Sequence, residues 1–349
     1  MSGSAGRSTW WTMKRLAKRL MPESAIAWLR DREAAAGLRL ETGLQMRRFA
    51  RGYSRRGSRE RARLESRVVY FTHQIEKGLS HAHMRYGFGM PALSQMIPLL
   101  VRLRAMGHGD GPGAVQAMAM DALGEYRARH EAAGYDLGYL RRLLPADMWD
   151  ELGRPGGAHG GSVAVTAASK AGNRYKTFAQ LSEGRRSIRE FADRPVSFDE
   201  IRPAIDAAMR TPSVCNRQPT RLCVVTDRDV IARALPIQGG YRGYAAPPAL
   251  ILVTADNQAF MNQNERNEGF VDGGMFAMSL LLALEAEGLA ACPLNTMLPA
   301  RRDAATRRLL GVPDSEFLVM YIAVGHFPDE TRTCRSHRFA AGDVTRVIA

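Results

Sequence analysis

The sequence predicts a helical N-terminal half joined by a glycine-rich linker to a C-terminal domain of mixed α+β or α/β class. Three short apolar segments are expected to be strands, namely Arg221–Thr226, Ala249–Thr254 and Leu318–Val324. Longer segments with helical periodicity separate them, and such a mixture of helices with few strands is typical of both classes. We expect four parts: a basic, partly flexible helical arm (1–66), a helical extension (67–152), a linker (153–173) and the mixed domain (174–349).

The charge of the chain is concentrated in the arm. The sequence has 49 Lys and Arg against 35 Asp and Glu, a net charge of +14. Residues 1–66 hold 16 of these basic residues and 6 of the acidic ones, so the arm accounts for +10 of the excess. A helical arm with a solvated basic face explains this pattern, and a basic amphipathic helix on an anionic membrane is the alternative. No ordered nucleic-acid-binding motif is present, so a nucleic acid partner is not expected.

The four cysteines, Cys215, Cys223, Cys292 and Cys334, show neither a CxxC motif nor Cys/His ligand spacing. A zinc site is therefore not expected. The sequence shows no secretory signal, and we expect no apolar run of the about 18 residues that span a membrane. These features favour a cytoplasmic protein with reduced thiols, peripheral to the inner face of the membrane if the arm binds lipid.

The extension is expected to contain helices at Ala92–Arg104, Val115–Arg129 and Tyr135–Leu144, after a first helix that ends with Gly78 as its C-cap. Four nearby side chains could be metal ligands: His73, Glu76, His81 and His83. Their spacing is not HExxH, and Lys77 among them would oppose a cation, so a metal is not expected.

The mixed domain is expected to contain a helix at Tyr175–Glu183 and another at Ser197–Met209. Ser197 and Glu200 have the spacing of a capping box. A loop at Thr211–Pro219 precedes the first strand, and Gly273–Glu287 is a helix that is apolar nearly all round and ends at Gly288.

One stretch of this domain, Gly184–Phe191 (GRRSIREF), places three arginines and a serine within five residues. A helix does not explain the pattern, because Arg185 and Arg189 would share one face while Arg186 and Ser187 would not. An irregular segment that wraps donors around an anion fits better, since the guanidinium fork matches phosphate oxygens and ring carbonyls. A solvated basic turn is the other interpretation of this stretch alone.

Four further motifs follow in order: Thr211–Pro219, Asp272-Gly273-Gly274, Glu287–Asn295 and Ile322–His326. Together with Gly184–Phe191, this series resembles the FMN-dependent nitroreductase family over roughly residues 175–349. The resemblance implies a homodimeric α+β fold with a central, mainly antiparallel sheet flanked by helices. It also implies FMN at the subunit interface and NADH or NADPH as the hydride donor.

The resemblance assigns four groups of cofactor-binding residues. The first is Arg185, Arg186, Ser187 and Arg189, with Arg185 on the phosphate and Arg189 at the N1/O2 edge of the flavin ring. The second, which the family supplies from the partner chain, is Pro212, Ser213, Asn216 and Gln218. Pro293, Leu294 and Asn295 match the stretch along the flavin near N5. The tail Arg335-Ser336-His337-Arg338 matches a phosphate clamp, in which Arg335, Ser336 and Arg338 are the assigned residues.

Two positions depart from the family pattern. Thr220 stands where many relatives have an aromatic residue, and Asn295-Thr296-Met297 stands where an acidic residue and a glycine are common. No side chain is assigned as acid, base or nucleophile, because in this chemistry flavin N5 accepts the hydride and passes electrons to a small-molecule acceptor such as a nitro compound or quinone. The acceptor itself does not follow from the sequence.

The stretch His73–Ser80 with Gly87-Phe88-Gly89 is similar to an extension of nitroreductase-family proteins from bacterial polysaccharide gene clusters. We expect the extension to cover the flavin pocket or to dock a partner. Two alternatives stay open. The same fold also hosts dehalogenation, azoline oxidation and flavin fragmentation. The chain could instead be a scaffold whose basic arm recruits it to a membrane or a polysaccharide-synthesis assembly.

Overall fold

The structure is a computed structural model of the chain, and it describes residues 21–107, 113–154 and 156–348. The N-terminal half is helical: α2 (Glu23–Gly52), α3 (Arg61–Leu79), α4 (Met90–Ala105), α5 (Ala114–Ala132), α6 (Gly138–Leu143) and α7 (Ala146–Glu151). The C-terminal part has the helices α8 (Ala167–Lys170), α9 (Phe178–Gly184), α10 (Phe198–Ala208), α11 (Arg228–Gln238), α12 (Glu268–Ala286), α13 (Ala300–Leu310) and α14 (Ala341–Val344). Its strands are β1 (Ser162–Thr166), β2 (Thr220–Val225), β3 (Ala249–Asp256), β4 (Leu289–Asn295), β5 (Glu316–His326) and β6 (Glu330–Cys334).

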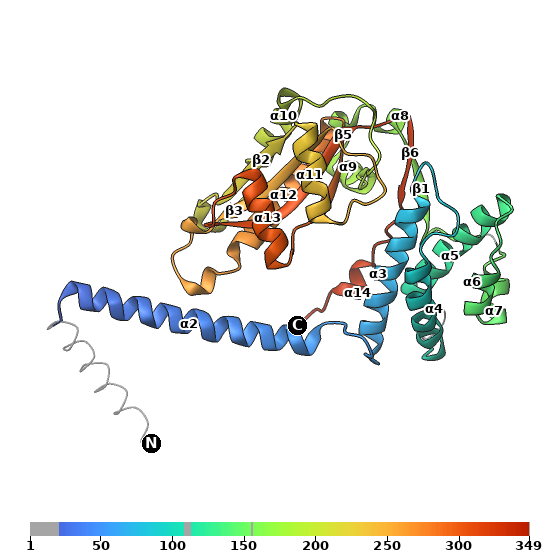
Figure 1. Cartoon of the computed structure of the whole chain (residues 1–349), viewed down its shortest axis with the longest axis horizontal. Coiled ribbons are helices and arrows are strands. Elements are labelled where there is room, and N and C mark those ends of the chain that lie inside the picture. The colour runs from blue at the N-terminus through green and yellow to red at the C-terminus, as the bar shows by residue number, and fades with distance from the viewer. Residues whose placement is uncertain (1–20, 108–112, 155, 349) are drawn as a thin grey trace, which may run out of the picture.

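The C-terminal part is built on a four-stranded antiparallel sheet with strand order β2-β3-β5-β4. This confirms the expected α+β class, and all three expected strands are present. The strand β3 is buried along nearly its whole length because helices cover both faces of the sheet. α10 and α12 pack on one face, whereas α11 and α13 lie over the other (Figure 1).

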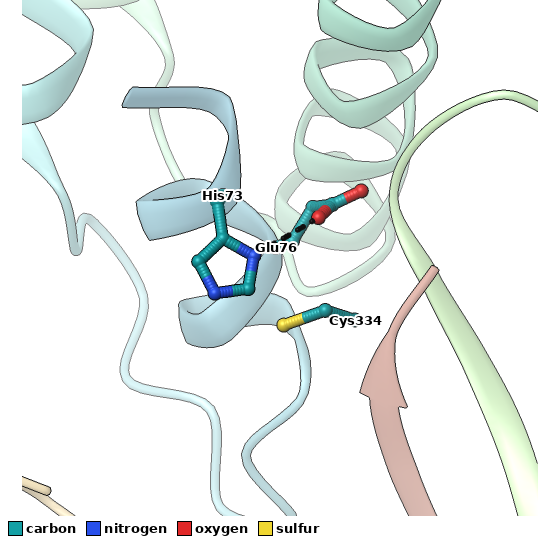
Figure 2. A group of neighbouring side chains, drawn as sticks. All are labelled: His73, Glu76 and Cys334. Carbon is teal, nitrogen blue, oxygen red and sulfur yellow. Dashed lines mark hydrogen bonds and ion pairs between the residues drawn. The ribbon is translucent and has the colours of Figure 1, made fainter. Parts of the chain in front are cut away.

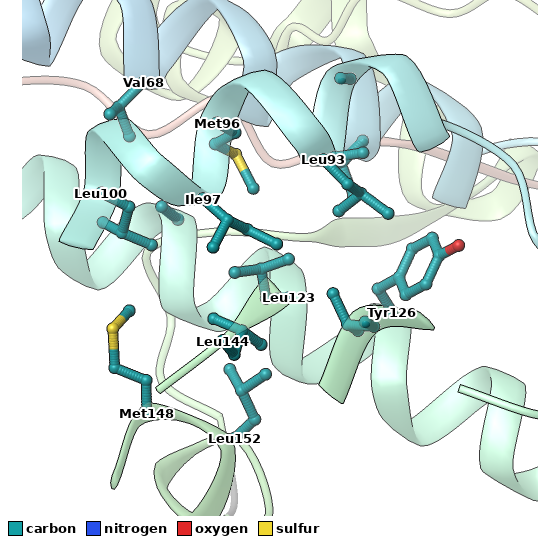
Figure 3. Packing of buried hydrophobic residues seen from close by; sticks show 14 of the residues in the cluster. Val68, Leu93, Met96, Ile97, Leu100, Leu123, Tyr126, Leu144, Met148 and Leu152 are labelled. Carbon is teal, nitrogen blue, oxygen red and sulfur yellow. The ribbon is translucent and has the colours of Figure 1, made fainter. Parts of the chain in front are cut away.

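The helical extension has its own core. Helices α3, α4 and α5 pack together, and Figure 3 shows their apolar side chains meeting those that follow α6. Leu93, Ile97 and Leu123 are fully buried there. Tyr126 is also buried, and its hydroxyl donates to the carbonyl of Phe88 (2.9 Å). The extension is therefore a folded unit, although the boundary expected at residue 66 falls inside α3.

Gly78 is not the C-cap of α3, as the sequence analysis expected. The helix continues through Leu79, and Ser80 is its C-cap. The reason for the glycine is packing: a Cβ at Gly78 would lie 1.8 Å from the ring of Phe88. This glycine lets the loop after α3 return closely over the helix.

The expected linker is also more ordered than its composition suggests. Its second half contains β1, which pairs antiparallel with β6 from Ser162↔Cys334 to Thr166↔Glu330. The alternation of small polar and apolar residues in Ser162–Thr166 fits a strand, but its partner lies more than 160 residues away along the chain. This two-stranded sheet joins the extension to the C-terminal tail.

The helix α2 makes up most of the described part of the arm, and it touches the C-terminal part near Arg266 and Asn267. α2 runs along the lower side of the C-terminal part in Figure 1 and has no buried residue. Its Gln45 side chain accepts hydrogen bonds from Arg266 (3.2 Å) and Asn267 (3.0 Å). α2 carries six arginines and four acidic residues, so its share of the arm's basic excess is small. Residues 1–20 of the arm lie outside the described residues.

Among the described residues, one helix is long and apolar enough to cross a membrane. It is α12, and half of the stretch is buried. The expectation that no such stretch exists was wrong, because the mean hydropathy of α12 stays high although it contains Asp272 and Glu285. A core helix on a sheet meets the same criterion, and α12 packs against β3, β4 and β5.

A buried ion pair ties the linker to α12. The Lys170 ammonium lies 2.6 Å from Glu285 Oε1, with side chains 7% and 3% exposed. Asn173 donates to the backbone carbonyl of Glu285 (2.8 Å). We predict that Lys170→Met lowers the free energy of unfolding by about 3–5 kcal/mol, because it leaves a carboxylate buried without its cation.

Urea denaturation measures this change. The matched control is Arg174→Met, which breaks the pair with Glu287, where the arginine side chain is 63% exposed. That variant should change the free energy of unfolding by less than about 1 kcal/mol. Equal effects of the two substitutions would contradict the prediction.

Candidate functional site

The arginine-rich segment Gly184–Phe191 is not helical beyond its first residue, as the sequence predicted. α9 ends at Gly184, and the chain then runs beside β4, where Ser187 forms a parallel bridge with Ala291. The amide of Ile188 donates to the carbonyl of Ala291 (3.1 Å). Ile188 is fully buried between β1 and β4, so this one apolar side chain anchors the segment and leaves the flanking arginines at the surface of the sheet.

The strand β6 lies on the other side of this segment. Thr333 donates through its hydroxyl to the carbonyl of Ser187 (2.7 Å), and Arg189 Nη1 lies 3.6 Å from Cys334 Sγ. In a parallel pairing that matches Ser187 with Ala291, Arg189 is level with Pro293. The structure therefore brings together three of the four predicted groups: the arginine segment, Pro293–Asn295 and the tail after β6.

Arg185 is the most unusual side chain of the group. Its Nη1 is buried and has no hydrogen-bond partner among the described residues. Burial lowers the pKa of Arg185, because it disfavours the charged form. The negative charge of Glu285 raises this pKa, whereas the positive charge of Arg338 lowers it further. A buried guanidinium with an unpaired donor, next to a second guanidinium, is a site prepared for an anion.

The other basic residues of these groups differ in their surroundings. Arg186 donates to the carbonyl of Glu183 (2.8 Å). Arg335 faces the extension, where its Nε donates to the carbonyl of Gly160 (3.0 Å). Arg338 donates to the carbonyl of Ser336 (2.6 Å). Of the two arginines predicted for the tail clamp, Arg338 is thus the one beside Arg185.

Pro293, Leu294 and Asn295 form the end of β4. Leu294 is buried, whereas Asn295 is exposed and its side-chain oxygen accepts from the amide of Met297. The carbonyl of Asn295 accepts from the side chain of Gln238 (3.0 Å). The turn at Asn295-Thr296-Met297 is the stretch where many relatives have an acidic residue and a glycine instead.

The second predicted group has a strained backbone. Four non-glycine residues among those described have positive φ: Cys215, Asn216, Gln218 and Ser336, with φ of 48°, 55°, 48° and 51°. Asn216, Gln218 and Ser336 are predicted cofactor-binding residues, and Cys215 lies next to Asn216 in the same loop. Each such residue costs about 1–3 kcal/mol, and this kind of strain is concentrated at binding sites. Asn216 and Gln218 are also exposed.

Buried and paired side chains hold this loop in place. The carboxylate of Asp272, which is 2% exposed, accepts from the amide of Val214 (3.2 Å). Ser213 accepts from the amide of Gln218 (2.9 Å). Arg217 forms a two-pronged pair with Glu265 and lowers the pKa of that carboxyl to about 2. These contacts within the chain hold the loop in its strained conformation.

The second group does not meet the other three within one chain. Asp272, which holds the loop, is at the start of α12, whereas Glu285, which lies near Arg185, is at its end. These thirteen steps of helix span about 20 Å. The sheet order agrees, because the loop leads into β2 at one edge and Ser187 pairs with β4 at the other.

Comparison with known proteins identifies this domain. A sequence profile of the nitroreductase family matches residues 183–240 and 238–326, which contain the arginine segment, the strained loop and β4. Residues 183–326 belong to the nitroreductase family. The extension lies outside the matched residues.

Individual relatives are distant. A candidate NADH dehydrogenase/NAD(P)H nitroreductase of Archaeoglobus fulgidus is 29% identical over 146 residues, which are 42% of this chain and 83% of the relative. An FMN reductase [NAD(P)H] of Bacillus subtilis is 24% identical over 161 residues, or 42% of this chain and 64% of the relative. A candidate nitroreductase of Desulfovibrio desulfuricans, solved with FMN, is 23% identical, with a TM-score of 0.43 over 50% of this chain and 98% of that one.

The extension docks directly on the nitroreductase domain at the arginine segment. The Glu190 carboxylate accepts from the amide of Ala82 (3.0 Å) and lies 3.7 Å from the imidazole of His81. Tyr241 donates through its hydroxyl to the carbonyl of Arg189. Tyr244 does the same to the carbonyl of Lys77 (2.9 Å). The segment that carries Arg189 is thus held between the extension and the domain.

The potential metal ligands of the sequence analysis do not assemble. His81 pairs with Glu190 and His83 is exposed, while His73 and Glu76 meet Cys334 of β6 instead (Figure 2). Ligand atoms of these three residues lie within 4.8 Å of one another. A His–Glu–Cys set has the chemistry of a zinc site. However, Arg189 lies 3.6 Å from the sulfur and Lys77 is close by, so the local charge opposes a cation.

The cluster instead connects α3 with β6. Two contacts raise the pKa of His73 from 6.5 to about 9. The larger contribution comes from the Cys334 side chain and the smaller one from Glu76. The His73 ring lies 3.4 Å from Glu76 Oε2. The His73 imidazolium pairs with one oxygen of the buried Glu76 carboxylate and contacts Cys334 of β6, so it stabilises the packing of the extension on this strand; the other oxygen, Glu76 Oε1, has no hydrogen-bond partner among the described residues. The sequence analysis missed Cys334 because only the pairing of β1 with β6 brings it to α3.

We predict a pH dependence from this cluster. A histidine whose pKa is raised on folding stabilises the folded state fully below pH 6.5, and this contribution is lost as the pH rises through about 9. The thermal midpoint of the wild type should therefore fall more between pH 6.5 and 9.5 than that of His73→Gln. Circular dichroism at several pH values measures the slopes. His159→Gln, beside Asp121 (3.6 Å), is the control and should keep the wild-type slope. Identical slopes for His73→Gln and the wild type would contradict the prediction.

Proposed function

We propose that this protein is an FMN-dependent NAD(P)H oxidoreductase that works as a homodimer. The observation that carries the proposal is Arg185, whose buried Nη1 has no hydrogen-bond partner among the described residues and which lies beside Arg338 and next to Ser187 on the edge of β4. These donors fit a phosphate dianion. The Bacillus subtilis relative, an FMN reductase that uses NAD(P)H, supports the same cofactor and donor.

Bound FMN would supply the two-electron chemistry between NADH or NADPH and a small-molecule acceptor. The residues of this chain would bind and orient it. Arg185, Ser187 and Arg338 would hold the phosphate. Arg189 would lie at the N1/O2 edge of the ring, where a fixed positive charge favours the electron-rich state. No side chain is needed as an acid, base or nucleophile.

A second copy of the chain would complete the site. Asn216 and Gln218 are at the opposite end of α12 from Arg185, so they reach the same flavin only from a partner. The face of α12 between the two ends is apolar and exposed at Val271, Met275 and Met278. Two α12 helices packed antiparallel along this face would place the loop of one chain on the arginine segment of the other, as a two-fold axis requires.

Three features of the sequence analysis remain predictions. The cytoplasmic location, the link to polysaccharide synthesis and the membrane role of the arm have no support beyond the sequence. A scaffold without flavin is the alternative function. It does not account for the unpaired Arg185 guanidinium.

We predict that the purified protein carries a flavin absorbance band that NADH or NADPH bleaches under nitrogen. Arg185→Met should weaken FMN binding by about 10- to 100-fold, the loss expected for a charge-assisted contact to phosphate of 1.5–3 kcal/mol. Arg233→Met, which removes an exposed arginine on α11, is the control and should bind as the wild type. A colourless protein that does not bind added FMN would refute the enzyme and favour the scaffold.

A heterodimer tests whether two chains share the site. Arg185→Met and Asn216→Gly/Gln218→Gly chains, carrying different tags, are co-expressed and purified over both tags. Glycine keeps the positive φ of the loop, so only the side chains are lost. If each site draws on both chains, the heterodimer has one intact site of two, and about half of its chains carry FMN. Flavin content no higher than that of either parent, or no recoverable heterodimer, would contradict the shared site.

A further inference from the structure

A cavity of about 560 Å³ lies between the extension and the nitroreductase domain. The end of α3 and the loop after it form one wall, with Lys77, His81, His83 and Arg85. The segment Arg242–Tyr244, after α11, forms the other. A volume of this size suits a small molecule and is too small for a nucleic acid or a membrane surface.

The lining of the cavity is cationic. Lys77, Arg85 and Arg242 line it together with two histidines, and no acidic residue does so. Within the part of the chain that the structure describes, these three cations form no ion pair with a carboxylate. Burial, and after it the charge of Arg189, lowers the pKa of Lys77, as expected for a cation without a counter-ion.

The cavity has a fixed shape and borders the predicted flavin site. The rings of His81 and Tyr244 stack with centroids 3.8 Å apart, and Tyr244 also bonds to the side chain of Ser80 (3.1 Å). The Glu190 carboxylate, which lies beside His81, is paired with that imidazole and with the amide of Ala82. Lys77 belongs both to the cavity wall and to the group around Arg189.

We propose that this cavity binds the anionic group of a molecule that exchanges electrons at the flavin site. The group is a sulfonate, carboxylate or phosphate, and Arg85, Arg242 and Lys77 are its partners. It would belong to the electron acceptor or to the phosphates of the nicotinamide donor. The kinetic test of this inference rests on the proposed function, because it needs turnover of the flavin. The chemistry of the inference rests only on the cavity, which is partly open to solvent. Lys77, which is half-buried, and Arg85 and Arg242, which are exposed, gather around it without a carboxylate partner among the described residues, and such a group of cations attracts an anion.

Two acceptors that differ mainly in charge test the proposal. The ratio of kcat/KM for 4-nitrobenzenesulfonate to that for 4-nitrobenzenesulfonamide is measured for the full chain with FMN. Arg85→Gln should lower the ratio by about 10-fold, the lower end of the loss expected for one charge-assisted contact because this arginine is exposed, and Arg242→Glu, which reverses the charge, should lower it further. The control is Arg102→Gln, which removes an exposed arginine about three turns after the start of α4, away from the residues that line the cavity, and should leave the ratio unchanged.

A second arm identifies the source of the anionic group. If the cavity holds donor phosphates, Arg242→Glu raises the KM for NADPH or NADH and leaves the acceptor ratio unchanged. Either change supports the site. Wild-type acceptor ratios and wild-type KM values for both donors in both variants would overturn it.

Calorimetry separates this inference from the proposed function. If the protein shows no flavin reduction, the proposed function fails, and binding of 4-nitrobenzenesulfonate to the full chain still tests the cavity. Binding that Arg242→Glu abolishes and Arg102→Gln preserves would support an anion site. No detectable binding, or equal binding by both variants, would overturn the inference.

Discussion

The antiparallel pairing of β1 with β6 is the interaction on which the other features depend. It fixes the end of the extension to the tail of the nitroreductase domain, residue by residue from Ser162↔Cys334 onward. Glu125 of α5 accepts from both the amide and the hydroxyl of Ser162, so the extension is bound to this strand as well. Because β6 lies beside Ser187, the same pairing places α3 against the arginine segment.

This arrangement brings several positively charged side chains together in a region where no carboxylate of the described residues is free to pair with them. Arg185, Arg189 and Lys77 are each at least partly buried, and the carboxylates nearby are engaged elsewhere. Glu285 pairs with Lys170, and Glu190 receives the amide of Ala82. Folding moves these cations out of water without supplying anions, which costs stability. A bound phosphate and a bound anionic substrate would both offset this cost.

The helix α12 sets the distances within the nitroreductase domain. Its close approach to β5 depends on Gly273, where a Cβ would lie 2.7 Å from Val319. Its two buried carboxylates hold two separate pieces of the site, the strained loop at Asp272 and the linker at Glu285. The length of this helix keeps the strained loop and the arginine segment of one chain apart. Its exposed apolar face offers the surface by which a second chain could do so.

Sequence reasoning predicted the mixed domain class, three of the four strands of the sheet, the irregular course of Gly184–Phe191 and the loop at Thr211–Pro219. These features are local: a capping box at Ser197, a buried strand at Ala249–Thr254 and a dense run of arginines can each be recognised within a few residues. The sequence did not reveal β1, β4 or β6, the packing reason for Gly78, or the meeting of His73 with Cys334. These features become visible only in the folded chain. They depend on contacts between segments far apart in the chain, and a short segment carries no record of its distant partner.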